Sequence, residues 1–361
     1  MKVAFPYFGY DTPVLAGFLE DLGAEIVMPA PTSKRTLELG VRYSPELICM
    51  PFKLTLGNLL EAIEAGADLL FMAAGARKCR FGYYHYLQSK ILKQVQPRCR
   101  LVPVGQYSPY DFFFRLMPEE FGVSPIRVIR ATLRMFARSV LTREFRQLLN
   151  RKRAVDFEEA ERLELQALKI IKRARSVAEV REARRQIRQM FALNGVLPDL
   201  KVGLVGEIFF CVEQSANQEI ERELGRLGVE VIFERSLYHH LRHLLGVDAS
   251  YFRSRYLARP FLRECPGGEA VRTVGEAIQF ARAGVDGIIQ VFPFTCMPEN
   301  MALEVLQHVS REYSVPVLSL SFDEHTSRTG LVTRLEAFVE LLRRRRRAGT
   351  GVGRGGRVVG D

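Results

Sequence analysis

Three cysteines lie in loops where they could act together. Cys49 is in SPELICMPFK, Cys79 is in ARKCRFGYY and Cys296 is in VFPFTCMPEN. Two of them are followed by Met-Pro, and a proline two residues after a cysteine presets the backbone for the first turn of a helix. The backbone N–H groups of such a helix would point at the sulfur, so we expect a lowered thiol pKa and thiolate character.

Basic side chains in the same loops would strengthen this effect, namely Lys53, Arg77, Lys78 and Arg80. Three thiolates converging on one cleft suit an iron–sulfur cluster with one iron left open to a substrate. A structural zinc site would use four ligands, and the tight CxxC spacing usual for zinc is absent. The residues alone leave a second interpretation open, in which all three are ordinary buried cysteines at strand ends.

The other cysteines and the histidine cluster carry less chemistry. Cys99, Cys211 and Cys265 are typical of core or loop positions, and Cys211 is the best reserve ligand because it follows a strand. His239 and His243 in HHLRH lie one helical turn apart, as two metal ligands could, but no third ligand accompanies them. We therefore interpret this pair as the surface of an amphipathic helix.

One polar loop could supply protons. LSFDEHTSRTG contains Asp323, Glu324 and His325 directly after the apolar run VPVLSL. These side chains could donate a proton to a substrate, and a capped polar loop is the alternative that stays open. The chain has no GxSxG, HExxH, complete GxGxxG or GxxxxGKS/T pattern, so we predict no nucleotide site of its own.

The elements that must position these residues occur twice along the chain. KVAFPYFGYD at the N-terminus and KVGLVGEIFF from Lys201 each begin with a short strand, predicted at residues 3–5 and 202–205. A helix, Leu-Gly and a second strand follow, with Gly23 and Gly228 expected to end the two helices and Asn217 to cap the second. Later, EAGADLLFMAAGARKC and RAGVDGIIQVFPFTC share Ala-Gly, an aspartate, an apolar strand and a cysteine loop.

Strands that alternate with helices and are apolar throughout predict an α/β protein with parallel sheets covered on both faces. We expect an N-terminal α/β domain at residues 1–109 and a C-terminal one at 198–342, joined by a helical linker or cap at 110–197 whose arginine face is solvated. Residues 343–361 are expected to be a disordered Arg/Gly tail. Ligands of such sheets gather at the carboxyl ends of the strands, which predicts a site in the cleft between the two halves.

Composition narrows the class of protein. Hydrophobic residues make up 47% of the 361 residues and charged residues 26%, which is typical of a soluble globular protein with substantial cores. The start, MKVAFPYFGYD, does not resemble a signal peptide, so we expect a cytoplasmic protein with reduced cysteines and no membrane association. The net charge of +11 owes much to the seven arginines of the tail, and a solubilising tail is favoured over a nucleic-acid-binding one.

Several long segments resemble a known family. SKRTLELGVRYSPELICMPFKLTLGNLLEAIEAGAD, CRFGYYHYLQ, KVGLVGEIFF, VFPFTCMPEN and LSFDEHTSRTGLVTRLEAF are similar to acyl-CoA dehydratase activase-related proteins, also called CoA protein activases. These are related to the cluster-bearing subunits of 2-hydroxyacyl-CoA dehydratases and benzoyl-CoA reductases. The resemblance covers most of residues 1–343, is weak through the helical middle, and excludes the tail. Two cysteines of the family pattern are missing here: ARKCRFGYY keeps only the second cysteine of its loop, Cys79, and Thr32 stands where a further cysteine is common.

The resemblance implies two flavodoxin-like (Rossmann-like) domains that hold a four-iron, four-sulfur (4Fe-4S), oxygen-sensitive cluster. The family's three ligand positions correspond to Cys49, Cys79 and Cys296. A double-cubane cluster of the wider superfamily uses six cysteines and is not expected, because Cys211 and Cys265 do not lie at family cysteine positions. The pocket of this site would be shaped and neutralised by Arg80, Tyr83 and Lys53. Protons would be shuttled by His325 or Glu324.

The resemblance also implies partners. A separate ATP-hydrolysing iron–sulfur activator would inject a low-potential electron, and this chain would use it in a dehydratase- or reductase-like reaction on a small substrate, with acyl-CoA as one possibility. A dimer is expected by analogy. The alternative is a non-catalytic electron-relay or assembly subunit that serves a partner enzyme.

Overall fold

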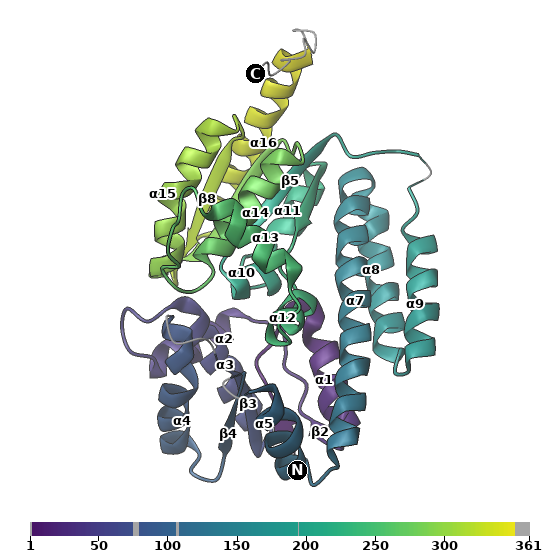
Figure 1. The fold of residues 1–361 in the computed structure, drawn as a ribbon, viewed down its shortest axis with the longest axis vertical. Coiled ribbons are helices and arrows are strands. Elements are labelled where there is room, and N and C mark those ends of the chain that lie inside the picture. Colours follow the sequence, from purple (N-terminus) through teal and green to yellow (C-terminus); the bar gives the residue numbers. More distant parts are fainter. Residues whose placement is uncertain (1, 75–78, 106–107, 194, 351–361) are drawn as a thin grey trace.

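Two four-stranded sheets form the framework of the molecule (Figure 1), and every neighbouring pair of strands is parallel. The computed structural model describes residues 2–74, 79–105, 108–193 and 195–350. The strands of the first sheet are β1 (Lys2–Ala4), β2 (Glu25–Ile26), β3 (Leu69–Ala73) and β4 (Arg100–Val104). Those of the second are β5 (Leu200–Gly206), β6 (Val229–Phe233), β7 (Gly287–Pro293) and β8 (Val317–Phe322). The predicted α/β class with two parallel sheets is confirmed.

The two sheets have the same topology. Their strand orders are β2-β1-β3-β4 and β6-β5-β7-β8, so the second strand of each half lies outside the first, and the third and fourth lie on the other side. This is the beginning of the flavodoxin-type order, in which the chain reverses direction across the sheet between the first and third strands. The repeated segments of the sequence correspond to this shared topology.

The helices of the first unit, defined here as the first sheet with its helices, connect consecutive strands. They are α1 (Thr12–Asp21), α2 (Lys34–Tyr43), α3 (Met50–Glu64) and α4 (Tyr84–Val95). Gly23 follows α1 with a φ of +99°, as expected for a residue that ends a helix in a left-handed conformation. α3 is buried along most of its length, because it packs Phe52, Leu56 and Leu59 against the sheet.

The second unit, defined as the second sheet with its helices, has more of them. They are α10 (Ile208–Val212), α11 (Ile220–Arg226), α12 (Leu237–Leu244), α13 (Ala249–Ala258), α14 (Ala270–Arg282), α15 (Met297–Glu312) and α16 (Arg328–Thr350). Asn217 accepts a hydrogen bond from the backbone N–H of Ile220, the first residue of α11, at 3.1 Å, but the N-cap position itself is Glu219. Gly228 follows α11 with a φ of +77°.

A helical segment stands beside both units (Figure 1). The short helices α5 (Pro109–Asp111), η3 (Phe112–Leu116) and α6 (Met117–Phe121) lead into the long helices α7 (Pro125–Val155), α8 (Phe157–Arg173) and α9 (Val177–Met190). α7 contacts α1 of the first unit and both α11 and β6 of the second. It therefore ties the two sheets to one support.

The expectation of a solvated arginine face is wrong for three arginines of α7. Arg138, Arg146 and Arg153 are buried. Each meets a carboxylate: Arg138 pairs with Asp21 at 3.3 Å, Arg146 with Glu221, and Arg153 with Glu161 at 2.9 Å and with a second glutamate. These three arginines lie on the side of α7 that packs against other elements, so they face inward, where a charge must be paired.

The prediction of a disordered tail is wrong for its first eight residues, 343–350. α16 continues to Thr350, so residues 343–350 are helical, and residues 351–361 lie outside the described ranges. The start of α16 is anchored in the core by Leu335, Val339 and Leu342, and extending an existing helix is easier than starting one. Arg343 adds a hydrogen bond to the carbonyl of Leu227 at 2.7 Å. Within the described ranges, no helix has the length and apolar character that crossing a membrane requires.

Candidate functional site

All three predicted cysteines, Cys49, Cys79 and Cys296, line one cavity of about 330 Å³. Cys49 immediately precedes α3, Cys79 precedes the short helix η2 (Arg80–Tyr83), and Cys296 precedes α15. The two Met-Pro sequences therefore begin helices, as the proline positions suggested. The fold brings thiols from three distant points of the chain to a single space.

The cavity lies at the carboxyl edges of both sheets. From the first unit it is lined by Phe5, which follows β1, and by Ala73 at the end of β3. From the second unit it is lined by Glu207, which follows β5, and by Pro293 at the end of β7. These four strands flank the point in each sheet where the strand order reverses, which is where α/β proteins bind their ligands.

Arg80 holds the three cysteine loops together. Its guanidinium donates one hydrogen bond to the carbonyl of Leu47 at 3.0 Å and another to the carbonyl of Thr295 at 2.8 Å. The Cys49 thiol also approaches the Thr295 carbonyl, at 3.9 Å. Arg80 lies outside the cavity lining, so it acts on the backbone of the loops rather than on the cavity directly.

Four further predicted residues also lie away from the cavity. Lys53 forms an ion pair with Glu324 that links α3 to the loop after β8. Tyr83 is 67% exposed, and His325 is exposed in a loop where the Asp323 carboxylate accepts its backbone N–H at 2.9 Å. This is the capped polar loop of the alternative interpretation. None of these four side chains lines the cavity.

The predicted proton-donor role does not fit Glu324. Partial burial disfavours ionisation of this carboxyl, but the hydrogen bond and the charge of Lys53 outweigh it and lower the pKa of Glu324. At neutral pH the side chain is therefore an anion held by Lys53, with no proton to donate.

The expected lowering of the cysteine pKa values is wrong for two of the three thiols. Burial raises the pKa of the Cys296 thiol, and the carboxyls of Glu299 and Glu207 raise it further. Burial likewise raises the pKa of Cys79. The helix N-termini are present, but the loss of water around the sulfur outweighs them. Arg77 and Lys78, expected to add positive potential, lie outside the described residues.

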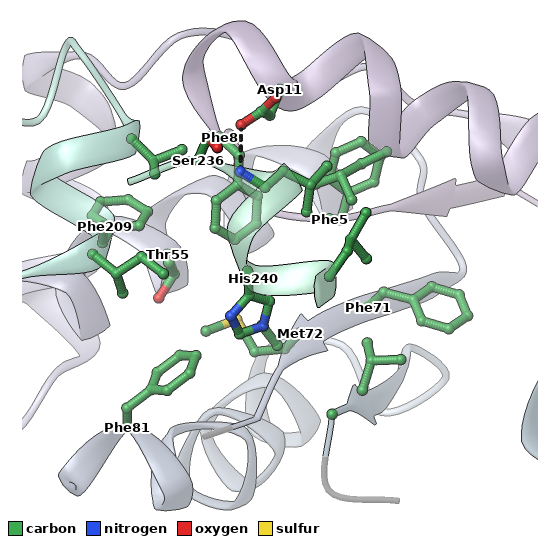
Figure 2. Close-up of a pocket in the computed structure, with 18 of the residues that line it drawn as sticks. Phe5, Phe8, Asp11, Thr55, Phe71, Met72, Phe81, Phe209, Ser236 and His240 are labelled. Atoms are coloured by element: carbon green, nitrogen blue, oxygen red, sulfur yellow. Dashed lines mark hydrogen bonds between the residues drawn. The ribbon is translucent and has the colours of Figure 1, made fainter. Parts of the chain in front are cut away.

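Two carboxyls of the cavity wall were not identified from the sequence. Glu207 accepts a hydrogen bond from the backbone N–H of Phe210 at 3.1 Å, and burial raises its pKa to about 7. Asp11 accepts the backbone N–H of Leu237 at 3.0 Å, the dashed line in Figure 2, and burial raises its pKa to about 6. The only signal for Glu207 was a Gly-Glu pair directly after an apolar strand.

His239 is more buried than predicted, whereas His243 is exposed, as expected for the surface of a helix. His239 is 4% exposed, with its ring nitrogens 3.0 Å from the Ser236 hydroxyl and 3.1 Å from the Glu234 carboxylate, so it is not helix surface. The neighbouring His240 lines the cavity and lies among the labelled side chains in Figure 2. Burial lowers the pKa of His240, which keeps its imidazole neutral.

The three cysteines of the cavity have the chemistry of metal ligands. Among the described residues, no group of three or more His, Cys, Asp or Glu side chains is placed to hold one metal ion. The three thiols that line the cavity are, however, the type of ligand that iron–sulfur clusters use. Cys211 is fully buried and Cys265 is exposed, and neither lines the cavity.

Comparison with known proteins identifies one part of the chain. Residues 4–74 match a family model described as a CoA enzyme activase uncharacterised domain. The match runs from β1 through β3 and includes Cys49. The predicted resemblance to CoA protein activases is therefore confirmed over this segment, which is a CoA enzyme activase-like domain. No curated protein matches the chain.

Proposed function

We propose that this protein is an iron–sulfur protein that accepts low-potential electrons from an ATP-hydrolysing activator and uses them in a reductase- or dehydratase-like reaction on a small substrate. The observation that carries the proposal is the meeting of Cys49, Cys79 and Cys296 on one cavity at the carboxyl edges of both sheets. The activase-like segment at residues 4–74 supports action together with a partner enzyme.

The three cysteines would hold a 4Fe-4S cluster, which supplies one-electron transfer when bound. Arg80 would keep the three loops in register by binding two of their carbonyls. Tyr84 is buried and lines the same cavity as Cys49. The aromatic walls would exclude water, which prolongs the life of a low-potential reduced state.

The first experiment measures iron and acid-labile sulfide per chain after anaerobic purification. Wild type is expected to contain about four of each, and Cys79→Ala is expected to lose most of both. Cys265→Ala is the matched control, because Cys265 is exposed and lies outside the cavity. The iron and sulfide content of Cys265→Ala should equal that of wild type.

Electron acceptance is tested on the same preparations. Addition of titanium(III) citrate should bleach the visible absorption of wild type and of Cys265→Ala. Wild type without iron after anaerobic reconstitution, or Cys79→Ala with full iron, would rule the proposal out.

A further inference from the structure

The cavity beside the cysteines is lined mainly by apolar side chains, and many of these are aromatic rings. Its walls combine residues of the first unit, the helical segment and the second unit, and Figure 2 shows several of the rings facing the same space. Nine phenylalanines line it: Phe5, Phe8, Phe18, Phe71, Phe81, Phe112, Phe113, Phe136 and Phe209. Rings arranged around a space favour an apolar guest, because they can contact it edge to face or stacked.

The polar groups of the wall are largely engaged already. The Asp11 carboxyl accepts the Leu237 N–H, the Glu207 carboxyl accepts the Phe210 N–H, and the Thr55 hydroxyl donates to the Pro51 carbonyl at 2.6 Å. His240 on α12 also lines the cavity, and its ring nitrogens can donate or accept a hydrogen bond.

The two carboxyls of the described wall, Asp11 and Glu207, disfavour an anionic guest. Among the described residues that line the cavity there is no lysine or arginine, whereas two carboxyls are present. A carboxylate or phosphate placed there would lose its water without gaining a cation, which is unfavourable. An uncharged guest meets no such penalty.

We propose that this cavity binds one uncharged, largely apolar small molecule, held between the phenylalanines that both units and the helical segment contribute. The inference deepens the proposed function by naming the class of its substrate. Only the statement that the bound molecule is the substrate rests on the proposed function. Binding itself follows from the walls and does not need the cluster.

The test uses two probes with one ring skeleton. N-phenyl-1-naphthylamine is uncharged, and 8-anilinonaphthalene-1-sulfonate adds a sulfonate. Each is titrated into the full-length chain, with the iron content measured on the same sample. The uncharged probe should bind saturably at one site per chain, and the sulfonate should bind at least about tenfold more weakly, because its charge has no partner in the cavity.

A tryptophan placed at the cavity locates the bound probe, because the chain contains none. Leu245 lines the cavity and is 46% exposed, whereas Leu165 on α8 is 66% exposed and lies outside it. The uncharged probe should quench the emission of Leu245→Trp over the concentration range in which it binds. The emission of Leu165→Trp should not change.

A blocking variant completes the design. Leu241 on α12 lines the cavity and is partly buried. Leu241→Trp should therefore fill part of the cavity and lower the affinity for the uncharged probe by about tenfold or more. Leu165→Trp should leave the affinity unchanged. If Leu241→Trp does not fold, the quenching of Leu245→Trp still decides the question.

Three results would overturn the inference: equal affinity for the two probes, no saturable binding of the uncharged probe, or equal quenching in Leu245→Trp and Leu165→Trp. A sample that holds iron but does not bind the probe overturns only this inference. A sample that binds the probe but holds no iron overturns only the proposal of an iron–sulfur cluster.

Discussion

Arg80 shows how an exposed side chain can organise a buried site. Its guanidinium lies outside the cavity, but it binds the carbonyls of Leu47 and Thr295, which are two residues before Cys49 and directly before Cys296. Arg80 itself follows Cys79. One planar group with several fixed donors can therefore hold three loops at once, which a lysine ammonium does less well.

We expect Arg80→Ala to loosen these loops and to expose the two buried thiols. Loss of about 1 kcal/mol of hydrogen bonding should raise the rate at which N-ethylmaleimide modifies Cys49 and Cys296 on the order of fivefold. The rate at Cys265, which is already exposed, serves as the internal reference and should not change. Mass spectrometry of digested protein measures all three rates.

Arg98→Ala is the matched control, since Arg98 is exposed and lies in the turn between α4 and β4. An Arg80→Ala protein with wild-type rates at both buried thiols would show that the guanidinium does not hold the loops.

At the scale of the elements, α7 fastens the second sheet through buried charge. The Arg146 guanidinium donates to the Glu221 carboxylate at 3.0 Å, to the Cys211 carbonyl at 2.6 Å and to the Arg235 carbonyl at 3.2 Å. It thus contacts α11, α10 and the residues after β6 from one position. Removing one partner of a buried pair leaves the other charge without compensation.

Arg146→Ala should therefore lower the free energy of unfolding by roughly 3–5 kcal/mol. Arg130→Ala, on an exposed turn of the same helix, should change it by no more than about 0.5 kcal/mol. Urea unfolding followed by circular dichroism measures both. Equal stability of the two variants would mean that α7 does not depend on this pairing.

At the scale of the whole molecule, the cavity exists because the two units meet. Asp11 of the first unit binds the Leu237 N–H of the second, and Lys53 pairs with Glu324 across the same junction. Gly9 lies so close to the second unit that a Cβ there would come within 2.5 Å of the Val212 carbonyl. The cavity therefore forms only while these contacts between the two units are kept.

Glu213, next to this contact, should make stability depend on pH. It is fully buried, and burial raises its pKa to about 7, with a further contribution from Glu219. The folded protein therefore keeps a proton that the unfolded chain releases above its ordinary pKa. The free energy of unfolding should fall as pH rises from about 4.5 to about 7, by up to roughly 3 kcal/mol for this group.

Urea unfolding at pH 5 and pH 8 measures this fall. Glu213→Gln cannot ionise, so it should show a smaller difference between the two pH values than wild type. Glu336→Gln changes an exposed carboxyl and should keep the wild-type difference. An unchanged pH dependence in Glu213→Gln would contradict the assignment.

The sequence by itself determined the architecture and the central set of cysteines. Apolar strands, helices with regular spacing and turn glycines are local patterns, and their repetition along the chain predicted two parallel sheets. Parallel strands place their carboxyl ends at one edge, so cysteines that follow such strands could be expected in a common cleft. Cys79 and Cys296 line the cavity for this reason, whereas Cys49 follows α2 and lines it at the start of α3.

Only the tertiary structure decided which charged and polar groups surround them. Lys53 and Glu324 pair away from the cavity, Arg146 faces inward, and Glu207 and His240 reach the cavity wall. The raised pKa values of Cys79 and Cys296 have the same origin. Burial and charge pairing arise from contacts between segments far apart in the chain, and a local pattern of residues carries no record of those contacts.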